Sequence, residues 1–221
     1  RQYFEQMSAL KSNPWAGLSS YQDPKYTDNP LKFSGREDDI YDLTRMVMKN
    51  IFVTLYGKSG IGKTSLLNAG VFPSLRDAGF LPVSVRLNIE AADCSFQQCI
   101  ITRLENLVRE GVTIKKVNVV EMPSDEFAQD YLWAYFARTR FIAEDSRTVF
   151  PVLAFDQFEE VFARRRKEAE TLLCQLAFLA DESHALSARI IDGENYEYDY
   201  NFRFIASIRE DDLYKLEDSI D

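Results

Sequence analysis

A glycine-rich loop between an apolar run and a helical pattern is the feature that most constrains how this chain can fold. The loop reads GKSGIGKT from Gly57 to Thr64, and it follows the apolar run IFVTLY that begins at Ile51. The run has the length and the β-branched content of a buried strand, and the residues KTSLLNAGVFPSL after the loop have a helical pattern up to Pro73. The sequence therefore predicts a strand, a tight loop and a helix, which is a unit of α/β folds.

The loop matches the pattern G-x-x-x-x-G-K-S/T, in which each part has a physical task. The glycines let backbone N–H groups converge on the α and β phosphates of a nucleotide, Lys63 reaches the β and γ phosphates, and the Thr64 hydroxyl binds Mg²⁺. We therefore predict that the chain binds ATP or ADP together with Mg²⁺. The loop residues predicted to contact the nucleotide are Gly57, Lys58, Ser59, Gly60, Ile61, Gly62, Lys63, Thr64 and Ser65.

The rest of the chain alternates strand and helix patterns, which predicts a parallel sheet wound by right-handed crossovers. We expect the fold of a P-loop NTPase, a three-layer α/β/α arrangement with a mainly parallel central sheet. The expected strands cover residues 51–56, 80–90, 148–156 and 202–208. The expected helices cover residues 35–50, 63–75 with an interruption at Pro73, 96–109, 125–141, and 157–186 with a break near Arg165.

The length of 221 residues fits one sizeable domain. Residues 1–34 are rich in Asn, Pro, Ser and Asp and predict an irregular arm, so we place the NTPase core at residues 35–221. The chain begins with Arg1, which suggests an excerpt of a longer protein.

Composition and charge argue against several classes of partner. The formal net charge of −9 repels phosphate backbones, so we expect no direct binding of nucleic acid. No apolar run reaches the length of about 18 residues that a membrane span needs, and no signal peptide pattern is present. The three cysteines lack metal-ligand spacing, and their odd number predicts no disulfide framework. These features predict a cytoplasmic protein.

A carboxylate that organises the metal ion is expected at the end of a neighbouring buried strand. The stretch PVLAFDQFEE supplies Asp156 at such a strand end, so we predict that Thr64 and Asp156 hold the metal. Glu159 and Glu160 follow within one helical turn, and either carboxylate could deprotonate the water that attacks the γ-phosphate. The residue pattern does not decide which of the two is the base.

An arginine is predicted to reach the same region from another strand. The stretch FRFIASIRE places Arg209 near the carboxyl end of its strand, where open parallel sheets bind their ligands. A guanidinium there could report whether a γ-phosphate is present. We therefore include Arg209 with Glu159 and Glu160 among the candidate catalytic residues.

The ordered set of motifs resembles the signal-transduction ATPases with numerous domains, abbreviated STAND, especially their bacterial branch. The resemblance spans about Asn13 to the end of the chain, and its acidic stretch is similar to that of NACHT modules. The motifs that carry it are NPWAGL, FSGRE, GKSGIGKTSLLNAGVFPSL, DQFEEVF and SIREDDL.

The resemblance implies specific roles. Phe33, Gly35 and Arg36 would form the base and sugar side of the nucleotide pocket. Arg209 would be a sensor residue on the strand between the two Walker strands. The family also implies a fifth strand, a helical lid and a winged-helix domain, which we expect beyond Asp221.

The role implied by the resemblance is that of an ATP-driven regulatory switch in a larger signalling protein. Such a switch is closed with ADP, self-associates with ATP, and couples a trigger sensed by a C-terminal region to an N-terminal effector. Many bacterial members act in defence against phage. We therefore expect an ATPase module.

Two other functions stay open at this point. A P-loop kinase or motor acting on a separate substrate would need an arginine-rich lid or nucleic-acid motifs, and neither is visible. A nucleotide-binding scaffold without turnover is suggested by Gln157, which stands directly after Asp156 where many related ATPases have their catalytic glutamate.

Overall fold

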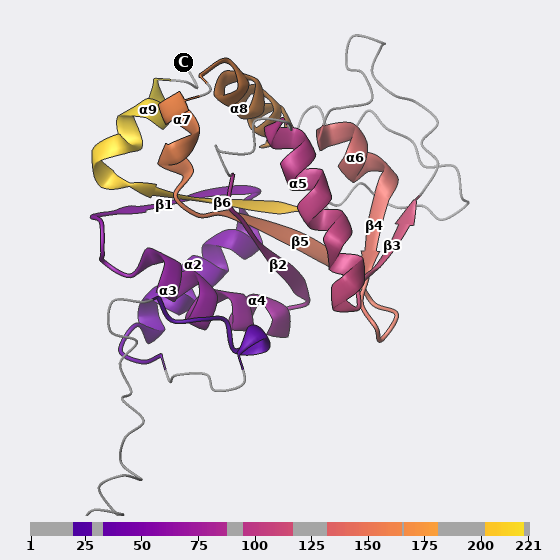
Figure 1. The fold of residues 1–221 in the computed structure, drawn as a ribbon. Coiled ribbons are helices and arrows are strands. Elements are labelled where there is room, and N and C mark those ends of the chain that lie inside the picture. The colour runs from indigo at the N-terminus through magenta and orange to yellow at the C-terminus, as the bar shows by residue number, and fades with distance from the viewer. Residues whose placement is uncertain are drawn as a thin grey trace, which may run out of the picture.

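The computed structural model describes residues 20–27, 33–87, 95–116, 132–164, 166–180 and 202–218. Its centre is a sheet in which four parallel strands lie in the order β1 (Phe52–Gly57), β6 (Arg203–Arg209), β5 (Thr148–Phe155) and β2 (Phe80–Val85). Two shorter antiparallel strands, β4 (Thr139–Ile142) and β3 (Thr113–Lys116), extend the sheet from β5 (Figure 1).

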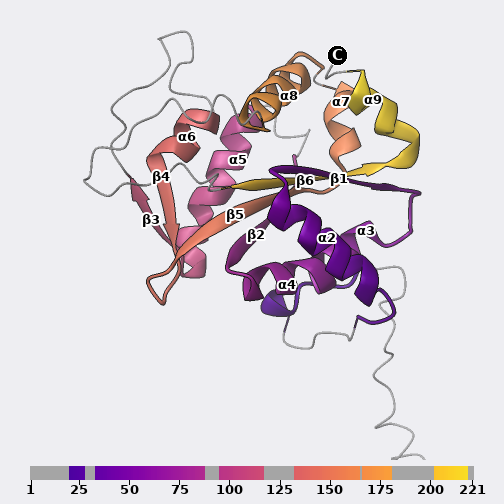
Figure 2. The same cartoon turned by 180° about the vertical axis from the view of Figure 1, so that it is seen from behind.

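Helices cover both faces of this sheet. One face carries α2 (Glu37–Lys49) and the continuous helical segment formed by α3 (Lys63–Leu66), the π-helical turn η2 (Leu67–Val71) and α4 (Phe72–Asp77). The other face carries α5 (Phe96–Glu105) with its 3₁₀ extension η3 (Asn106–Glu110), α6 (Leu132–Arg138), α7 (Val161–Arg164) and α8 (Arg166–Ala180). The two views show these layers from opposite sides (Figure 2). The predicted α/β/α fold with a mainly parallel sheet is confirmed.

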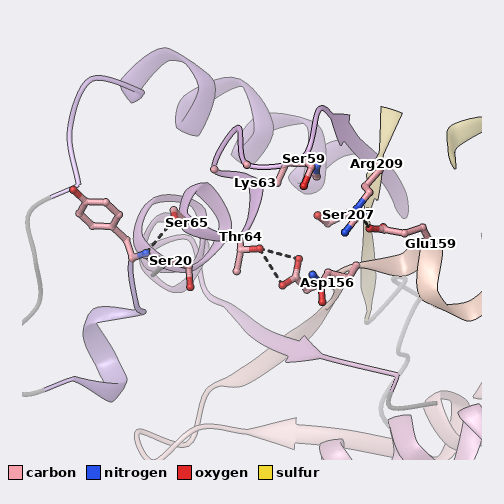
Figure 3. Close-up of a pocket in the computed structure, with 13 residues that line it drawn as sticks. Ser20, Ser59, Lys63, Thr64, Ser65, Asp156, Glu159, Ser207 and Arg209 are labelled. Atoms are coloured by element: carbon pink, nitrogen blue, oxygen red, sulfur yellow. Dashed lines mark hydrogen bonds and ion pairs between the residues drawn. The ribbon is translucent and has the colours of Figure 1, made fainter. Parts of the chain in front are cut away.

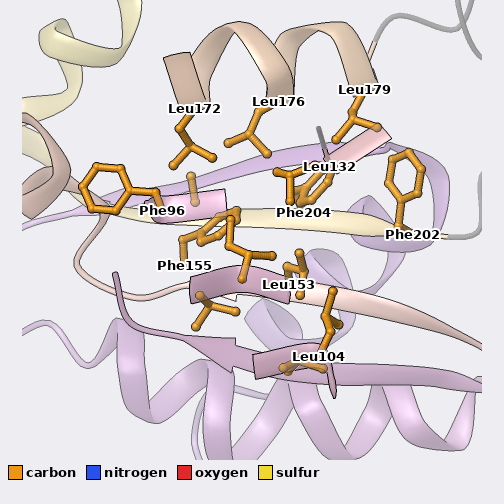
Figure 4. Close-up of a cluster of buried hydrophobic side chains, with 14 of the residues drawn as sticks. Phe96, Leu104, Leu132, Leu153, Phe155, Leu172, Leu176, Leu179, Phe202 and Phe204 are labelled. Atoms are coloured by element: carbon orange, nitrogen blue, oxygen red, sulfur yellow. The ribbon is translucent and has the colours of Figure 1, made fainter. Parts of the chain in front are cut away.

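Successive side chains of the central strands point to opposite faces of the sheet, which divides the hydrophobic core into two clusters. In β5, Leu153 and Phe155 face the larger cluster, and Val152 and Ala154 face the smaller one. The larger cluster packs the strands against α5, α6 and α8 (Figure 4). Phe204 of β6 lies in this cluster and stacks on Phe155 at a ring-centroid distance of 6.1 Å. The two central strands β5 and β6 are therefore held rigidly on both faces.

Helix termini follow the expected charge and capping rules. Glu37, Asp38 and Asp39 lie in the first turn of α2, where acidic side chains interact favourably with the helix dipole. Ser95 caps α5, because its hydroxyl accepts a hydrogen bond from the backbone N–H of Gln98 at 3.2 Å. The strand that ends at Arg209 is followed by the 3₁₀ turn η6 (Glu210–Asp212) and α9 (Leu213–Glu217).

Three expectations were wrong in detail. The helix after the glycine-rich loop continues past Pro73, because the wide π-helical turn η2 precedes the proline and places it in the first turn of α4. The helix expected to run to residue 141 ends at Arg138, because residues 139–142 form a strand that pairs with β3 along its length and with β5 at Phe141 and Ile142. The cysteine count predicted no disulfide framework, but Cys99 is disulfide-bonded.

The part of the arm from Ser20 to Thr27 contacts the core. It contains the 3₁₀ turn η1 (Pro24–Tyr26), and the buried Asp23 forms an ion pair with Arg76 of α4. The backbone N–H of Tyr21 donates to the Ser65 hydroxyl at 3.0 Å. Within the described residues, no helix is both long and apolar enough to cross a membrane.

Candidate functional site

A cavity of about 520 Å³ lies where the carboxyl ends of β1, β5 and β6 meet the start of α3. This is the edge at which open parallel sheets bind ligands. The glycine-rich loop borders it on one side, and the segments after β5 and at the end of β6 border it on the other (Figure 3). The residues that line the cavity are Ser20, Tyr21, Ser59, Gly60, Gly62, Lys63, Thr64, Ser65, Asp156, Gln157, Glu159, Ser207 and Arg209.

The glycine-rich loop leads directly into α3. Gly62 is the N-cap of this helix and has a φ of 90°, a conformation that a residue with a Cβ rarely adopts. The Lys63 ammonium donates to the backbone carbonyls of Gly57 and Lys58 at 2.7 and 3.3 Å. No carboxylate among the described residues forms an ion pair with Lys63. Its charge is therefore held inside the loop and is not neutralised by a carboxylate of the described residues.

Thr64 and Asp156 meet directly although 92 positions separate them in the sequence. The Thr64 hydroxyl lies 3.1 and 3.0 Å from the two carboxylate oxygens of Asp156, which follows the last residue of β5. Both are hard oxygen ligands of the kind that Mg²⁺ prefers, and Mg²⁺ usually takes only one or two protein ligands beside water and phosphate. The described residues contain no cluster of three or more acidic, histidine or cysteine side chains for a metal. The pair therefore fits a magnesium ion shared with a nucleotide.

The chain turns sharply after Asp156. Gln157 has φ and ψ of 55° and 48°, in the left-handed region that is uncommon for a residue with a side chain. The following 3₁₀ turn η4 (Phe158–Glu160) brings the Glu159 carboxylate to the Arg209 guanidinium, with Oε1 2.9 Å from Nε. Glu159 is 9% exposed, so the turn delivers a nearly buried carboxylate to the cavity.

Glu160 lies in a different environment from Glu159. Its carboxylate is 3.3 Å from the guanidinium of Arg86, which follows β2, and its side chain is 36% exposed. Glu160 is not among the residues that line the cavity. The structure therefore brings only one of the two candidate bases to the site.

Comparison with known families agrees with this geometry. The sequence profile of the family described as Novel STAND NTPase 1 matches residues 14–219. The chain belongs to this family of NTPases. The match covers nearly the whole chain and includes the glycine-rich loop, Asp156 and Arg209.

Two of the solved structures similar to this STAND NTPase come from Pyrococcus abyssi and Aeropyrum pernix. A Walker-type ATPase of Pyrococcus abyssi is 14% identical, with a TM-score of 0.49, and the match covers 92% of this chain and 52% of that one. The ORC2 protein of Aeropyrum pernix, described in ADPNP–ADP complexes, is 13% identical, with a TM-score of 0.45 and coverage of 91% and 51%. This chain thus spans about half the length of both proteins. No curated protein matches the sequence.

Six residues predicted to contact the nucleotide are not among those that line the cavity of the STAND NTPase: Phe33, Gly35, Arg36, Gly57, Lys58 and Ile61. Arg36 donates from Nη1 to the carbonyl of Ile61 at 3.3 Å, which ties the start of α2 to the glycine-rich loop, and it also pairs with Asp39. Phe33 packs edge-on against the Tyr21 ring at 5.2 Å between ring centroids. Gly35, with a φ of 85°, lies between these two residues in the sequence.

Four residues that line the cavity were not predicted as site residues from the sequence: Ser20, Tyr21, Gln157 and Ser207. Ser207 could have been found from the strand period, because it lies two positions before Arg209 and so shares its face of β6. Its neighbour Ile205 belongs to the smaller core cluster, on the side of α3. Ser20 and Tyr21 lie in the irregular arm, where no periodicity indicates which residues contact the core.

Proposed function

We propose that this chain binds ATP and hydrolyses it to ADP and phosphate, as the nucleotide-dependent switch of a larger STAND signalling protein. The observation that carries the proposal is the meeting of Thr64 and Asp156 beside Lys63 in one cavity at the carboxyl ends of the central strands. These three side chains are the cation and the oxygen ligands that a magnesium triphosphate requires.

Phosphate binding is assigned to the glycine-rich loop and the start of α3. The backbone N–H groups at Gly60 and Gly62 would donate hydrogen bonds to phosphate oxygens. Lys63 would give up its hydrogen bonds to the loop carbonyls and donate to a phosphate oxygen instead. Magnesium held by Thr64 and Asp156 would neutralise negative charge on the β and γ phosphates. The arm residues Ser20 and Tyr21 close the cavity on the side of Ser65.

We assign the general base to Glu159 rather than to Glu160. Glu159 lines the cavity, and its Oε2 is buried without a hydrogen-bond partner among the described residues, so it can accept a proton from a water in the cavity. Glu160 points to Arg86 and stays partly exposed outside the cavity.

Arg209 is assigned the role of a sensor for the γ-phosphate. Its guanidinium is 49% exposed although Nε lies 2.9 Å from Glu159 Oε1, so the exposed part of the guanidinium could bind a phosphate oxygen. It lies at the end of β6, the strand between β1 and β5. An ATP-bound site would therefore engage Arg209 and an ADP-bound site would not.

The test of this function is nucleotide binding and turnover by the full-length protein and its Lys63→Ala variant. Loss of a charge-assisted hydrogen bond to phosphate should weaken ATP affinity by about 10- to 100-fold in calorimetry. Lys49→Ala, at the exposed end of α2, is the control and should bind as the wild type does. Equal affinity of wild type and Lys63→Ala would overturn the assignment. Binding with no release of phosphate would favour a scaffold without turnover.

The wider role is inferred from the family resemblance. We propose that ATP binding promotes self-association of the NTPase module in the cytoplasm, in response to a trigger sensed elsewhere in the longer protein. We also propose that the system acts in antiphage defence. A phage challenge of cells that carry the full-length gene, with and without Lys63→Ala, tests the last step, and equal protection by both would contradict it.

A further inference from the structure

Three buried polar atoms without a hydrogen-bond partner border the candidate nucleotide cavity. They are Ser207 Oγ, Gln157 Oε1 and Glu159 Oε2. Among the described residues, these are the three such atoms that belong to side chains lining the cavity. Because buried polar groups in proteins are nearly always hydrogen-bonded, a group of unpartnered atoms at one cavity indicates a polar molecule that binds there.

Ser207 is placed beside the cavity by β6. It is 1% exposed and pairs in register with Leu55 of β1, on the face of the sheet that carries Ile205 and α3. Its side chain points into the space between the glycine-rich loop and the ion pair of Glu159 with Arg209 (Figure 3). Buried positions on a central parallel strand are usually apolar, so a hydroxyl here has a purpose other than packing.

Glu159 is oriented by its ion pair with Arg209, and Gln157 by its backbone conformation. Arg209 occupies Oε1 of Glu159 at 2.9 Å, so Oε2 is the oxygen left to accept a hydrogen bond. The left-handed conformation of Gln157 sets the direction in which its side chain leaves the strand end. Its amide oxygen is buried and has no partner among the described residues.

We propose that Ser207 is a further catalytic residue, which with Gln157 holds the attacking water against Glu159. The proposal rests on the proposed ATPase function. The water donates one hydrogen bond to Glu159 Oε2 and one to Gln157 Oε1, and it accepts one from the Ser207 hydroxyl. Its remaining lone pair is then free to attack the γ-phosphorus.

The hydrolytic step balances with these groups. The water oxygen forms a bond to the γ-phosphorus, and the bond from that phosphorus to the oxygen bridging the β and γ phosphates breaks, with its electron pair leaving on ADP. One proton of the water passes to the Glu159 carboxylate, which later releases it to solvent, and the other stays on the oxygen that becomes part of the phosphate product. Ser207 and Gln157 gain or lose no proton and act by orienting the water.

The test separates positioning of water from binding of nucleotide. In the full-length protein, Ser207→Ala should lower kcat about tenfold, the effect of losing one hydrogen bond at the reacting water, while KM and ATP affinity stay within about twofold of wild type. Ser207→Thr keeps a hydroxyl and should recover part of the rate. Ser84→Ala, at an exposed position of β2, is the matched control and should leave both parameters unchanged.

A second variant covers the case in which Ser207→Ala does not fold. Asparagine tolerates the left-handed conformation, but its shorter side chain moves the amide away from the attacking water. Gln157→Asn should therefore lower kcat about three- to tenfold at unchanged ATP affinity. Wild-type kcat in both variants, or a parallel loss of ATP affinity, would overturn the role of Ser207. Failure of the wild type to bind ATP would instead overturn the proposed function itself.

A crystal structure with Mg²⁺ and a non-hydrolysable ATP analogue gives a readout that does not depend on turnover. An ordered water within hydrogen-bond distance of Ser207 Oγ, Gln157 Oε1 and Glu159 Oε2 is the expected result. Direct contact of the Ser207 hydroxyl with a phosphate oxygen or with another side chain, with no water at these atoms, would contradict the proposal. This readout also decides the case in which the protein binds ATP without measurable turnover.

Discussion

Glu159 and Glu160 are adjacent in the sequence but face different surroundings. The 3₁₀ turn after Gln157 directs Glu159 into the cavity, where Arg209 holds one of its oxygens, and directs Glu160 to Arg86. Glu159 lines the cavity and can accept a proton from a water bound there, whereas Glu160 lies outside the cavity and does not reach that water. Surface pairs of this kind also contribute only about 0–1 kcal/mol to stability.

The first prediction contrasts these two glutamates. Glu159→Gln should lower kcat by about 100- to 10,000-fold, the range for loss of a positioned general base, with ATP affinity largely kept. Glu160→Gln, the matched control next to it, should keep kcat within about twofold because Glu160 lies outside the cavity. Steady-state phosphate release measures both. A larger loss in Glu160→Gln than in Glu159→Gln would reverse the assignment of the base.

The second prediction concerns Arg209. Because its guanidinium is half exposed at the cavity and the exposed part could bind a γ-phosphate, Arg209→Ala should weaken ATP binding about tenfold more than ADP binding. Calorimetry with each nucleotide measures the ratio. Arg147→Ala, at an exposed arginine in the turn before β5, should leave the ratio unchanged. An Arg209→Ala variant with the wild-type ratio would count against the sensor role.

At the scale of elements, Gly70 controls how closely α2 packs on the helical segment after the glycine-rich loop. A Cβ added to Gly70 would lie 2.6 Å from both Cδ1 and Cγ1 of Ile40 in α2. Gly70 lies within the π-helical turn η2, and it is this close approach of Ile40 that requires a residue without a side chain. The contact fixes α2, whose preceding Arg36 bonds the loop carbonyl of Ile61.

The third prediction follows from that contact. Gly70→Ala should lower the free energy of unfolding by about 1–3 kcal/mol, because the inserted methyl overpacks a helix interface. Ile40→Ala removes both clashing atoms, so the double variant should lose less than the sum of the two single changes. Urea unfolding of the four proteins measures this coupling. Strict additivity would show that the two residues do not constrain each other.

The elements differ in how much their sequence reveals. The strands 52–57 and 148–155 were predictable, because each is an apolar run followed by a loop with its own pattern. The strand 139–142 was not, because its four residues directly follow the aromatic pattern of α6 and become a strand by pairing with β3 and β5. The passage of a helix through Pro73 depends on a π-helical turn that no residue pattern indicates.

The site shows the same division between what local pattern reveals and what the fold supplies. Lys63, Thr64 and Asp156 were predictable, because their chemistry is tied to fixed positions in a strand–loop–helix unit and at a strand end. The separation of Glu159 from Glu160 depends on the left-handed Gln157, and a sequence does not reveal that backbone conformation. The two cavity residues of the arm were missed because contacts between residues distant in sequence hold this segment, among them the hydrogen bond from Tyr21 to Ser65 and the ring contact of Tyr21 with Phe33.

At the scale of the whole molecule, the cavity joins distant parts of the chain into one site. It is bordered by the arm at Ser20, by the start of α3, by the segment after β5 and by the end of β6 at Arg209. The arm is tied to the core by the ion pair of the buried Asp23 with Arg76. A ligand that binds all of these segments binds only the folded chain, so its binding energy adds to the stability of the whole fold.

The last prediction uses this linkage to detect the metal. Mg²⁺ and ATP at about 100 times the dissociation constant should add about 2.7 kcal/mol to stability, which raises the Tm by about 5–10 °C for a chain of this size. Asp156→Asn should lose most of the magnesium-dependent part of the shift, because it removes the charged partner of Thr64 at the proposed metal site. The magnesium-dependent part of the Tm shift is measured by thermal unfolding of both proteins with ATP, once in Mg²⁺ and once in excess EDTA. A wild-type shift that is the same in EDTA as in Mg²⁺ would mean that nucleotide binds without the ion, and that Thr64 and Asp156 serve only to join α3 to β5.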